Sequence, residues 1–122
     1  MSYEITWEVE KDYIKVCAAG EQTLEDNIKL VSFVIESCEK YGVGKVVVDI
    51  RGLKGQPGTT ADFKLANIAV SEALGRIRKT AIINDEESLA YTAFFETAIR
   101  NRGINLYAFK NEAEAFEWIS QG

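Results

Sequence analysis

The sequence predicts an α/β fold: a five-stranded mixed, mostly parallel sheet with an N-terminal β-hairpin and four helices, in the order ββαβαβαβα. Two patterns lead to this prediction. Runs of β-branched residues alternate with segments of helical periodicity, and such alternation requires crossover connections between parallel strands. The first two strands instead follow each other through a short turn, as an antiparallel pair does. The length of 122 residues fits one domain, 1–122.

The hairpin is predicted over residues 3–19. Polar and apolar side chains alternate at the start, with Tyr3, Ile5, Trp7 and Val9 on one face and Glu4, Thr6, Glu8 and Glu10 on the other. A period of two with one polar face is typical of a half-buried strand. Lys11 and Asp12 then form a tight connection, and the second strand ends before Gly20.

The first helix is predicted from Thr23 to about Tyr41. Thr23 can cap it, and Gly42 can end it. Six residues at helical spacing form its apolar stripe: Leu24, Ile28, Val31, Val34, Ile35 and Cys38. Phe33 lies nearly opposite the centre of this stripe, so we expect it to be a surface aromatic residue.

The remaining elements repeat a strand-then-helix pattern. Residues 45–50 form a continuous β-branched run, which is typical of a strand covered on both faces. A glycine-rich loop is expected at 51–60 and a helix at 61–75. The later strands and helices are expected at 80–84, 86–102, 104–109 and from Asn111 onward.

The helix at 61–75 has an unusually wide apolar arc. Its polar strip is only Lys64, Asn67 and Ser71. The other side carries Phe63, Ala66, Val70, Ala73 and Leu74, and the arc is extended by Ala61, Leu65 and Ile68. An arc of this width indicates burial on more than one side. The second surface could meet a dimer mate, a partner or an apolar ligand, or it could be covered by the protein's own loop.

The glycine-rich loop at 51–60 leads into the start of that helix. A helix N-terminus attracts anions, but the spacing of Gly52 and Gly58 does not match a phosphate-binding loop, and no lysine follows Gly58. The alternatives are a plain connecting loop and an anion or phosphorylation site. Thr59 and Thr60 are the candidate phosphoacceptors, and a simple helix-capping role is the other interpretation of at least one of them.

Histidine is absent, and the two cysteines, Cys17 and Cys38, are far apart in the sequence. The commonest general base and the imidazole metal ligands are therefore missing. Two separated cysteines cannot make a four-cysteine zinc site either. We expect no catalytic residues, no metal and no cofactor, and hence no enzyme. Both cysteines fall at apolar positions and are expected to be buried.

The chain is acidic, with a net charge of −5 and a pI of about 4.8. Its densest basic stretch, 76–79, is too short for a nucleic-acid footprint, so neither nucleic acid nor an anionic membrane is an expected partner. No apolar run approaches the ~20 residues of a membrane span, and the N-terminus lacks the features of a signal peptide. We expect no membrane insertion and a cytoplasmic location with free thiols.

The predicted order, the strand Val46-Val47-Val48-Asp49-Ile50 that opens into a long loop, and the C-terminal segment at 107–119 carry a resemblance. The chain resembles the SpoIIAA-like branch of the STAS superfamily, the sulphate transporter and anti-sigma-factor antagonist domains. The resemblance implies a module that docks on protein partners, sometimes switched by phosphorylation in an Asp-Ser-Ser-Gly-like loop. That pattern is missing here, although Thr59 and Thr60 fall near the corresponding place.

The leading hypothesis is a non-catalytic regulatory or protein-interaction module that docks through the 51–60 loop and the 61–75 helix. Its partner is another protein or a second copy in a homodimer. The expected partner or ligand face contains Phe63, Leu65, Ile68 and Phe33. The alternative is a carrier or sensor of a small apolar or lipid-like ligand in a Sec14-like pocket. A closed apolar cavity beside Phe63 and Leu65 would favour it, and a solid core would exclude it. An enzyme that uses the acids near the loop is a third reading, but no nucleophile–base pair supports it.

Overall fold

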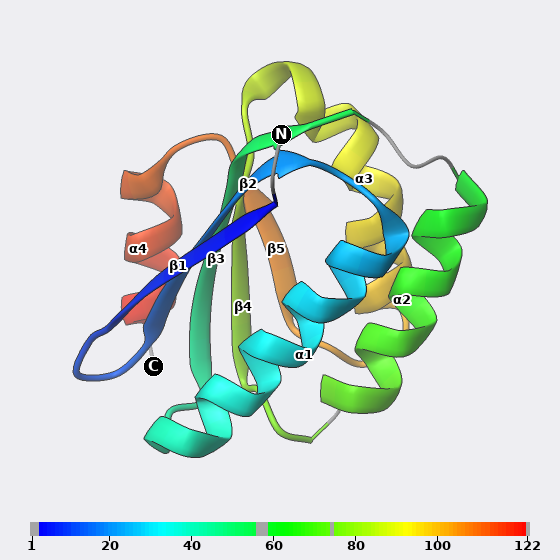
Figure 1. The fold of residues 1–122 in the computed structure, drawn as a ribbon. Helices are drawn as coiled ribbons and strands as arrows, with labels where there is room; N and C mark the ends of the chain where they lie inside the picture. The colour runs from blue at the N-terminus through cyan, green and yellow to red at the C-terminus, as the bar shows by residue number, and fades with distance from the viewer. Residues whose placement is uncertain (1–2, 56–58, 74, 122) are drawn as a thin grey trace.

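The computed structural model describes residues 3–55, 59–73 and 75–121. Its elements follow the predicted order ββαβαβαβα, which is confirmed (Figure 1). The strands are β1 (Glu4–Val9), β2 (Ile14–Glu21), β3 (Lys45–Lys54), β4 (Lys79–Ile83) and β5 (Leu106–Phe109). The helices are α1 (Leu24–Tyr41), α2 (Thr59–Ala73), α3 (Glu86–Arg100) and α4 (Glu112–Ser120).

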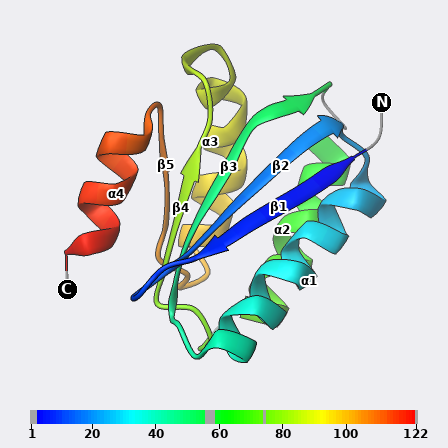
Figure 2. The same cartoon turned by 60° about the vertical axis from the view of Figure 1, so that its left-hand side comes forward.

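The strands lie in the sheet in the same order as in the sequence, β1-β2-β3-β4-β5, which the residue pattern alone left open. β1 pairs antiparallel with β2, and every later pair is parallel. Crossovers between parallel strands are right-handed. Because each one here moves to the next strand in the same direction, α1, α2 and α3 all lie on one face of the sheet, and α4 lies on the other (Figure 2).

The core has two layers, one on each face of the sheet. On the side of the three helices, the buried apolar residues of β2, β3 and β4 pack under α1, α2 and α3, and they are Ile14, Val16, Ala18, Val46, Val48 and Ile82. On the other side, Val47, Ala81 and Ile83 pack under Ala115 and Ile119 of α4. Successive strand residues point to opposite faces, so the continuous β-branched run of β3 serves both layers.

The helix caps agree with the sequence. The side chain of Thr23 accepts a hydrogen bond from the backbone N–H of Asp26 at the start of α1, and Gly42 ends this helix in a left-handed conformation, with φ of 67°. Asp85 caps α3 by accepting from the N–H of Ser88, and Asn111 caps α4 in the same way. These local bonds fix where the helices begin, and therefore which residues face the end of the sheet.

The apolar face of β1 is covered over only part of its length. Tyr3 and Ile5 pack against the core as expected, but Trp7 and Val9 are 48% and 44% exposed, because β1 is the edge strand and projects beyond α1. Phe33, expected on the surface, is instead half-buried. Its ring packs edge-on against Trp7, with 5.1 Å between the ring centroids. The two aromatic residues shield each other at the rim of the domain.

The predicted boundaries of the 51–60 loop and the 61–75 helix are wrong. Residues 51–54 continue β3, which pairs with β2 beyond a register shift so that Gly52 lies opposite Ala19. A Cβ atom at Gly52 would come within 2.8 Å of the Ala19 Cβ, so this glycine allows two strands to approach closely rather than a loop to turn. The helix is also displaced: it begins at Thr59 and ends at Ala73.

Candidate functional site

An apolar cavity of about 150 Å³ lies between the sheet and the three helices that cover one of its faces. The described walls come from α1, α2, α3 and the inner side of the sheet. Aliphatic side chains dominate them, including Leu30, Val34, Ile35, Val48, Leu53, Leu65, Ile82, Ile99 and Leu106. None of the described lining residues carries a titratable side chain, and the polar ones are Gln22, Asn27, Thr80 and Thr92.

Small side chains on α2 account for part of this space. Ala66, Ala69 and Ala73 are the buried residues among the described side chains of the helix, and the last two line the cavity. Protein interiors are normally packed without voids of this size. At ~24 cal/mol per Å³, a fully enclosed empty cavity of this volume would cost roughly 3–4 kcal/mol, which is an upper bound for this partly open space. A sequence that retains such a cavity gives up stability that one larger side chain could supply.

A second, polar hollow of about 350 Å³ adjoins the cavity at the carboxyl ends of the strands. The two spaces share Gln22, Ile50 and Leu53 in their walls. The hollow is completed at the end of β3 by Lys54 and Gly55, and at the start of α3 by Asn84, Asp85 and Ser88. An apolar chamber and a polar chamber therefore lie side by side.

Gln22 holds the junction between the two spaces. Its backbone N–H donates to the Lys54 carbonyl at 2.8 Å, and its side-chain Nε2 donates to the Gly55 carbonyl at 2.8 Å. Its Oε1 accepts from Nδ2 of Asn27 at 3.2 Å, and Asn27 in turn accepts from the Tyr3 hydroxyl at 2.9 Å. Burial, together with the charge of Asp26, raises the pKa of Tyr3, so this hydroxyl remains a donor. The end of β3 is thereby connected to the start of α1.

The residues predicted to form one partner or ligand face are not all in one place. Leu65 lines the apolar cavity. Ile68, on the same helix, is half-buried, and among the described residues it belongs neither to the cavity walls nor to the apolar clusters. Phe33 packs on Trp7, on the side of α1 that faces β1. The side chains of Thr59, Thr60 and Phe63 lie outside the described residues.

Several residues of this site were not predicted. Gln22 sits in a short connection and Asn27 within the first helix, and neither belongs to a motif. The alanines 66, 69 and 73 did carry a signal. At spacings of three and four they place small side chains along the buried side of one helix, where larger aliphatic residues usually stand. Such a stripe indicates either close helix packing or unfilled space, and here Ala69 and Ala73 face unfilled space.

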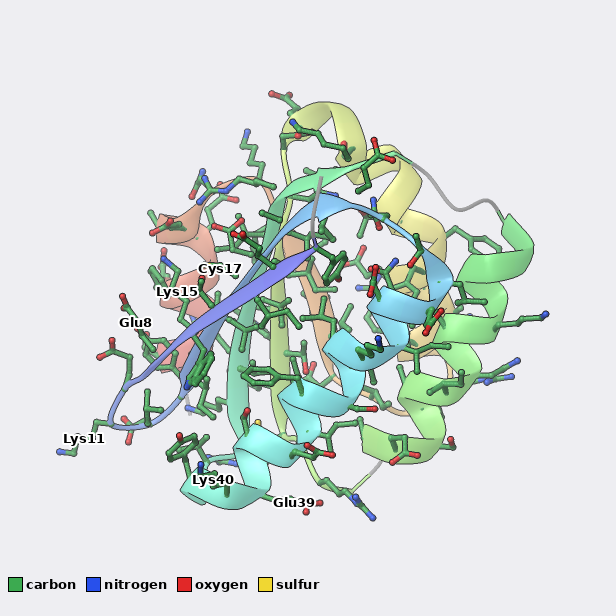
Figure 3. The ribbon with its side chains drawn as sticks, viewed as in Figure 1. Glu8, Lys11, Lys15, Cys17, Glu39 and Lys40 are labelled. Carbon is green, nitrogen blue, oxygen red and sulfur yellow. The ribbon has the colours of Figure 1, made fainter. Side chains whose placement is uncertain are left out.

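A charged cluster lies on the opposite face of the sheet, beside α4. Arg51 donates to Asp49 at 2.7 Å and to Glu112 of α4 at 2.8 Å, and Lys15 reaches Glu112 at 3.4 Å. Figure 3 shows Lys15 together with Glu8 and Cys17 along the β1–β2 hairpin. Burial raises the pKa of Asp49, but the hydrogen bonds from Arg51 outweigh it, so the pKa of this carboxyl is below its usual value. The cluster attaches the start of α4 to the sheet.

We expect Arg51→Met to lower the free energy of unfolding by about 1–2 kcal/mol at neutral pH, a value reduced for the partial exposure of Arg51. Because the folded-state pKa of Asp49 is lowered, its contribution is present above the unfolded pKa of 3.8 and is lost as pH falls through the folded pKa. The difference between wild type and variant should therefore narrow below about pH 4. Urea unfolding of both proteins at a series of pH values measures this difference in the free energy of unfolding.

Arg76→Met is the control for this prediction. Arg76 pairs with Glu39 at 2.9 Å, but both side chains are more than half exposed, at 52% and 56%. We expect a loss below about 0.5 kcal/mol that does not narrow in acid. Equal losses for the two arginine variants would show that the Arg51 cluster contributes no more to stability than an exposed ion pair does.

The two cysteines differ in how deeply they are buried. Cys38 is buried as expected, and burial, with the charge of Glu39, raises its pKa to about 11. Cys17 was expected to be buried but is only half-buried, because it points to the α4 side of the sheet at β2, while α4 packs mainly over β3, β4 and β5. Burial and the charge of Asp49 raise the pKa of Cys17. Both thiols are therefore weaker nucleophiles than an ordinary cysteine at neutral pH.

Two further searches cover only the described part of the chain. In residues 3–55, 64–73, 75–86, 88–89 and 92–121, whose side chains the structure describes, no three histidine, cysteine or acidic groups come together in a cluster that could hold a metal ion. Within residues 3–55, 59–73 and 75–121, every helix is too short or too polar to cross a membrane.

Three solved structures share this fold. An anti-sigma factor antagonist from Mycobacterium paratuberculosis superposes with a TM-score of 0.65 at 12% identity, over 97% of this chain and 94% of that one. The unphosphorylated anti-sigma factor antagonist SpoIIAA gives 0.61 at 11% identity, over 97% and 96%. An uncharacterised protein from Shewanella loihica with a SpoIIAA-like fold gives 0.64 at 20% identity, over 98% and 96%. At these identities the likeness shows the fold alone.

The amino-acid sequence identifies a protein family, which the structural likeness alone does not. No protein with a curated description matches the chain. A family model described as SpoIIAA-like matches residues 13–120, which run from the second strand to the last helix. The resemblance drawn from the residue pattern is thereby confirmed, and this chain belongs to the SpoIIAA-like family.

Proposed function

We propose that the chain is a non-catalytic regulatory module of STAS type that docks on a protein through α2 and the connection that leads into it. Family membership is the observation that carries this proposal, since two proteins of the same fold are anti-sigma factor antagonists. The weakly nucleophilic thiols and the lack of histidine support a role without catalysis. The partner is another protein or a second copy of this chain.

Ile68 is the residue through which α2 is best placed to dock. The wide apolar arc of the helix is largely used inside the domain, because Ala66, Ala69 and Ala73 are buried and Leu65 lines the cavity. Ile68 is the partly exposed aliphatic residue left over among the described positions. Covering it would remove apolar surface from water, which favours association. Thr59 and Thr60 stand in the first turn of α2, where a phosphate group would meet the positive end of the helix dipole.

Ile68→Asp tests the docking surface, with Ser71→Asp as its control. Both place a carboxylate on α2, but Ser71 is exposed on its polar strip. Sedimentation and native mass spectrometry would follow the dimer and any co-purified partner, after circular dichroism confirms folding. We expect assembly to be lost in Ile68→Asp and kept in Ser71→Asp. Assemblies that survive both substitutions would rule out docking through this helix.

The apolar cavity favours a second candidate function, a carrier or sensor of a small apolar ligand. An apolar cavity of about this size, engineered in another protein, remains dry and binds benzene. We expect benzene to raise the Tm of this protein and Ala69→Leu to abolish the effect, because the larger side chain fills the space. Ala66→Leu is the matched control, since Ala66 is buried on the same helix but is not among the described cavity walls. An unchanged Tm in saturated benzene would exclude the carrier function.

A further inference from the structure

The two adjoining spaces differ sharply in the groups that they offer. The described walls of the apolar cavity hold no charged side chain. Those of the polar hollow hold one cation, Lys54, and one carboxylate, Asp85. The formal charges of these two described residues cancel, so together they favour neither sign of ligand. The net charge of the whole chain, −5, adds no attraction for an anion.

The polar groups at the junction are fixed amides. The Gln22 side chain is held between Gly55 and Asn27. On the other side of the hollow, Asn84 donates from Nδ2 to the Thr92 hydroxyl at 2.8 Å and accepts at Oδ1 from the Asp85 N–H at 2.9 Å. An amide has two N–H donors and two acceptor lone pairs, so each side chain retains one donor and one acceptor site. The bonds already made hold these groups in place before a ligand arrives.

From this arrangement we infer that the joined spaces bind a small uncharged molecule with an apolar body and one hydrogen-bonding end. The body occupies the apolar cavity, and the polar end lies in the hollow beside Gln22 and Asn84. A charged end would lose its hydration without a net opposite charge to replace it, which is costly. A hydroxyl or amide end would exchange its bonds to water for bonds to the two amides. This inference rests on the second candidate function, and it specifies the class of ligand.

A series of probes that share a six-carbon body tests the inference: 1-hexanol, hexanoate and hexylamine, with benzene as a probe that has no polar end. Calorimetric titration of the wild-type protein measures each affinity. We expect 1-hexanol to bind about 5-fold more tightly than benzene, the equivalent of one hydrogen bond. Hexanoate and hexylamine should bind at least about 10-fold more weakly than 1-hexanol, because their charges must be desolvated.

The substitution Gln22→Met tests how much the polar end of the ligand contributes to binding, separately from its apolar body. Methionine has nearly the shape of glutamine but cannot donate or accept as an amide does. We expect this variant to lose the preference for 1-hexanol over benzene, when both affinities are measured in the variant. If either ion binds as tightly as the alcohol, or if Gln22→Met leaves the preference for the alcohol intact, the inference is wrong while the carrier function stands. If benzene and the six-carbon probes all fail to bind, both are wrong.

Discussion

Replacing Ile82 with alanine should lower the free energy of unfolding by about 3–5 kcal/mol, and a small apolar molecule should restore part of that loss. Ile82 is buried in β4, and its side chain is part of the cavity wall. Shortening it enlarges a space that already exists, so the neighbouring side chains have little to collapse onto. A molecule that fills the space binds the folded state and not the unfolded chain, and it stabilises the fold by mass action.

The matched control is the next residue of the same strand. Ile83 is fully buried, but it points to the opposite face of the sheet and packs under α4. We expect Ile83→Ala to cost about as much as Ile82→Ala, because the same atoms are removed from a tightly packed layer. Urea unfolding with and without benzene distinguishes the two variants. Benzene should stabilise Ile83→Ala by about as much as the wild type, whose cavity that variant keeps, and Ile82→Ala by more. Equal stabilisation of the two variants would mean that benzene does not fill the space beside Ile82.

Trp118→Ala should cost about 2–4 kcal/mol, somewhat less than a fully buried tryptophan, because this ring is half-buried. The ring lies 5.7 Å from the centroid of Phe109, and the ammonium of Lys79 stands 4.6 Å above it. Lys79 also donates to the carbonyls of Trp118 and Gln121, at 2.8 Å and 2.5 Å, and so caps the end of α4 with a positive charge. Removing the ring loses apolar burial and the cation–π contact together.

Hydrogen exchange locates the effect of this substitution. We expect the amides of α4 to lose protection before those of α1, because the ring helps to hold α4 over Val47, Ala81 and Ile83. Tyr107→Ala is the control: Tyr107 belongs to the same aromatic group, but it is 39% exposed and should cost about 1 kcal/mol or less. A uniform loss of protection across the domain would indicate that α4 does not open on its own.

The elements of this fold could be predicted because each has a local pattern. The alternation in β1, the capping groups Thr23, Asp85 and Asn111, and the β-branched run of β3 depend on neighbours in the sequence. The errors arose where distant residues decide. The sequence around Gly52 predicts a loop, but in the structure Gly52 is a strand residue that pairs with Ala19. The position of Phe33 in the helical pattern predicts a surface residue, but in the structure Trp7 packs on it.

The candidate site was less predictable for a related reason. The wide arc of α2 indicated burial on more than one side, and Leu65 does line the cavity. The cavity itself depends on the combined volumes of side chains from helices and strands across the whole sequence, and no single segment specifies that sum. The role of Gln22 depends on where the end of β3 lies relative to α1, which only the pairing of β2 with β3 establishes.

The order of the strands affects how the chain can fold. Each strand lies beside the strand that precedes it in the sequence, so no pairing has to wait for a distant segment. The hairpin of β1 and β2 needs the shortest closure, and each helix–strand unit can then add to the edge left by the previous one. Such an order keeps the contact order low for a parallel sheet, and low contact order accompanies fast folding. During such assembly the sheet exposes the unpaired backbone groups of one parallel edge strand at a time. The last strand added, β5, is the shortest of the five.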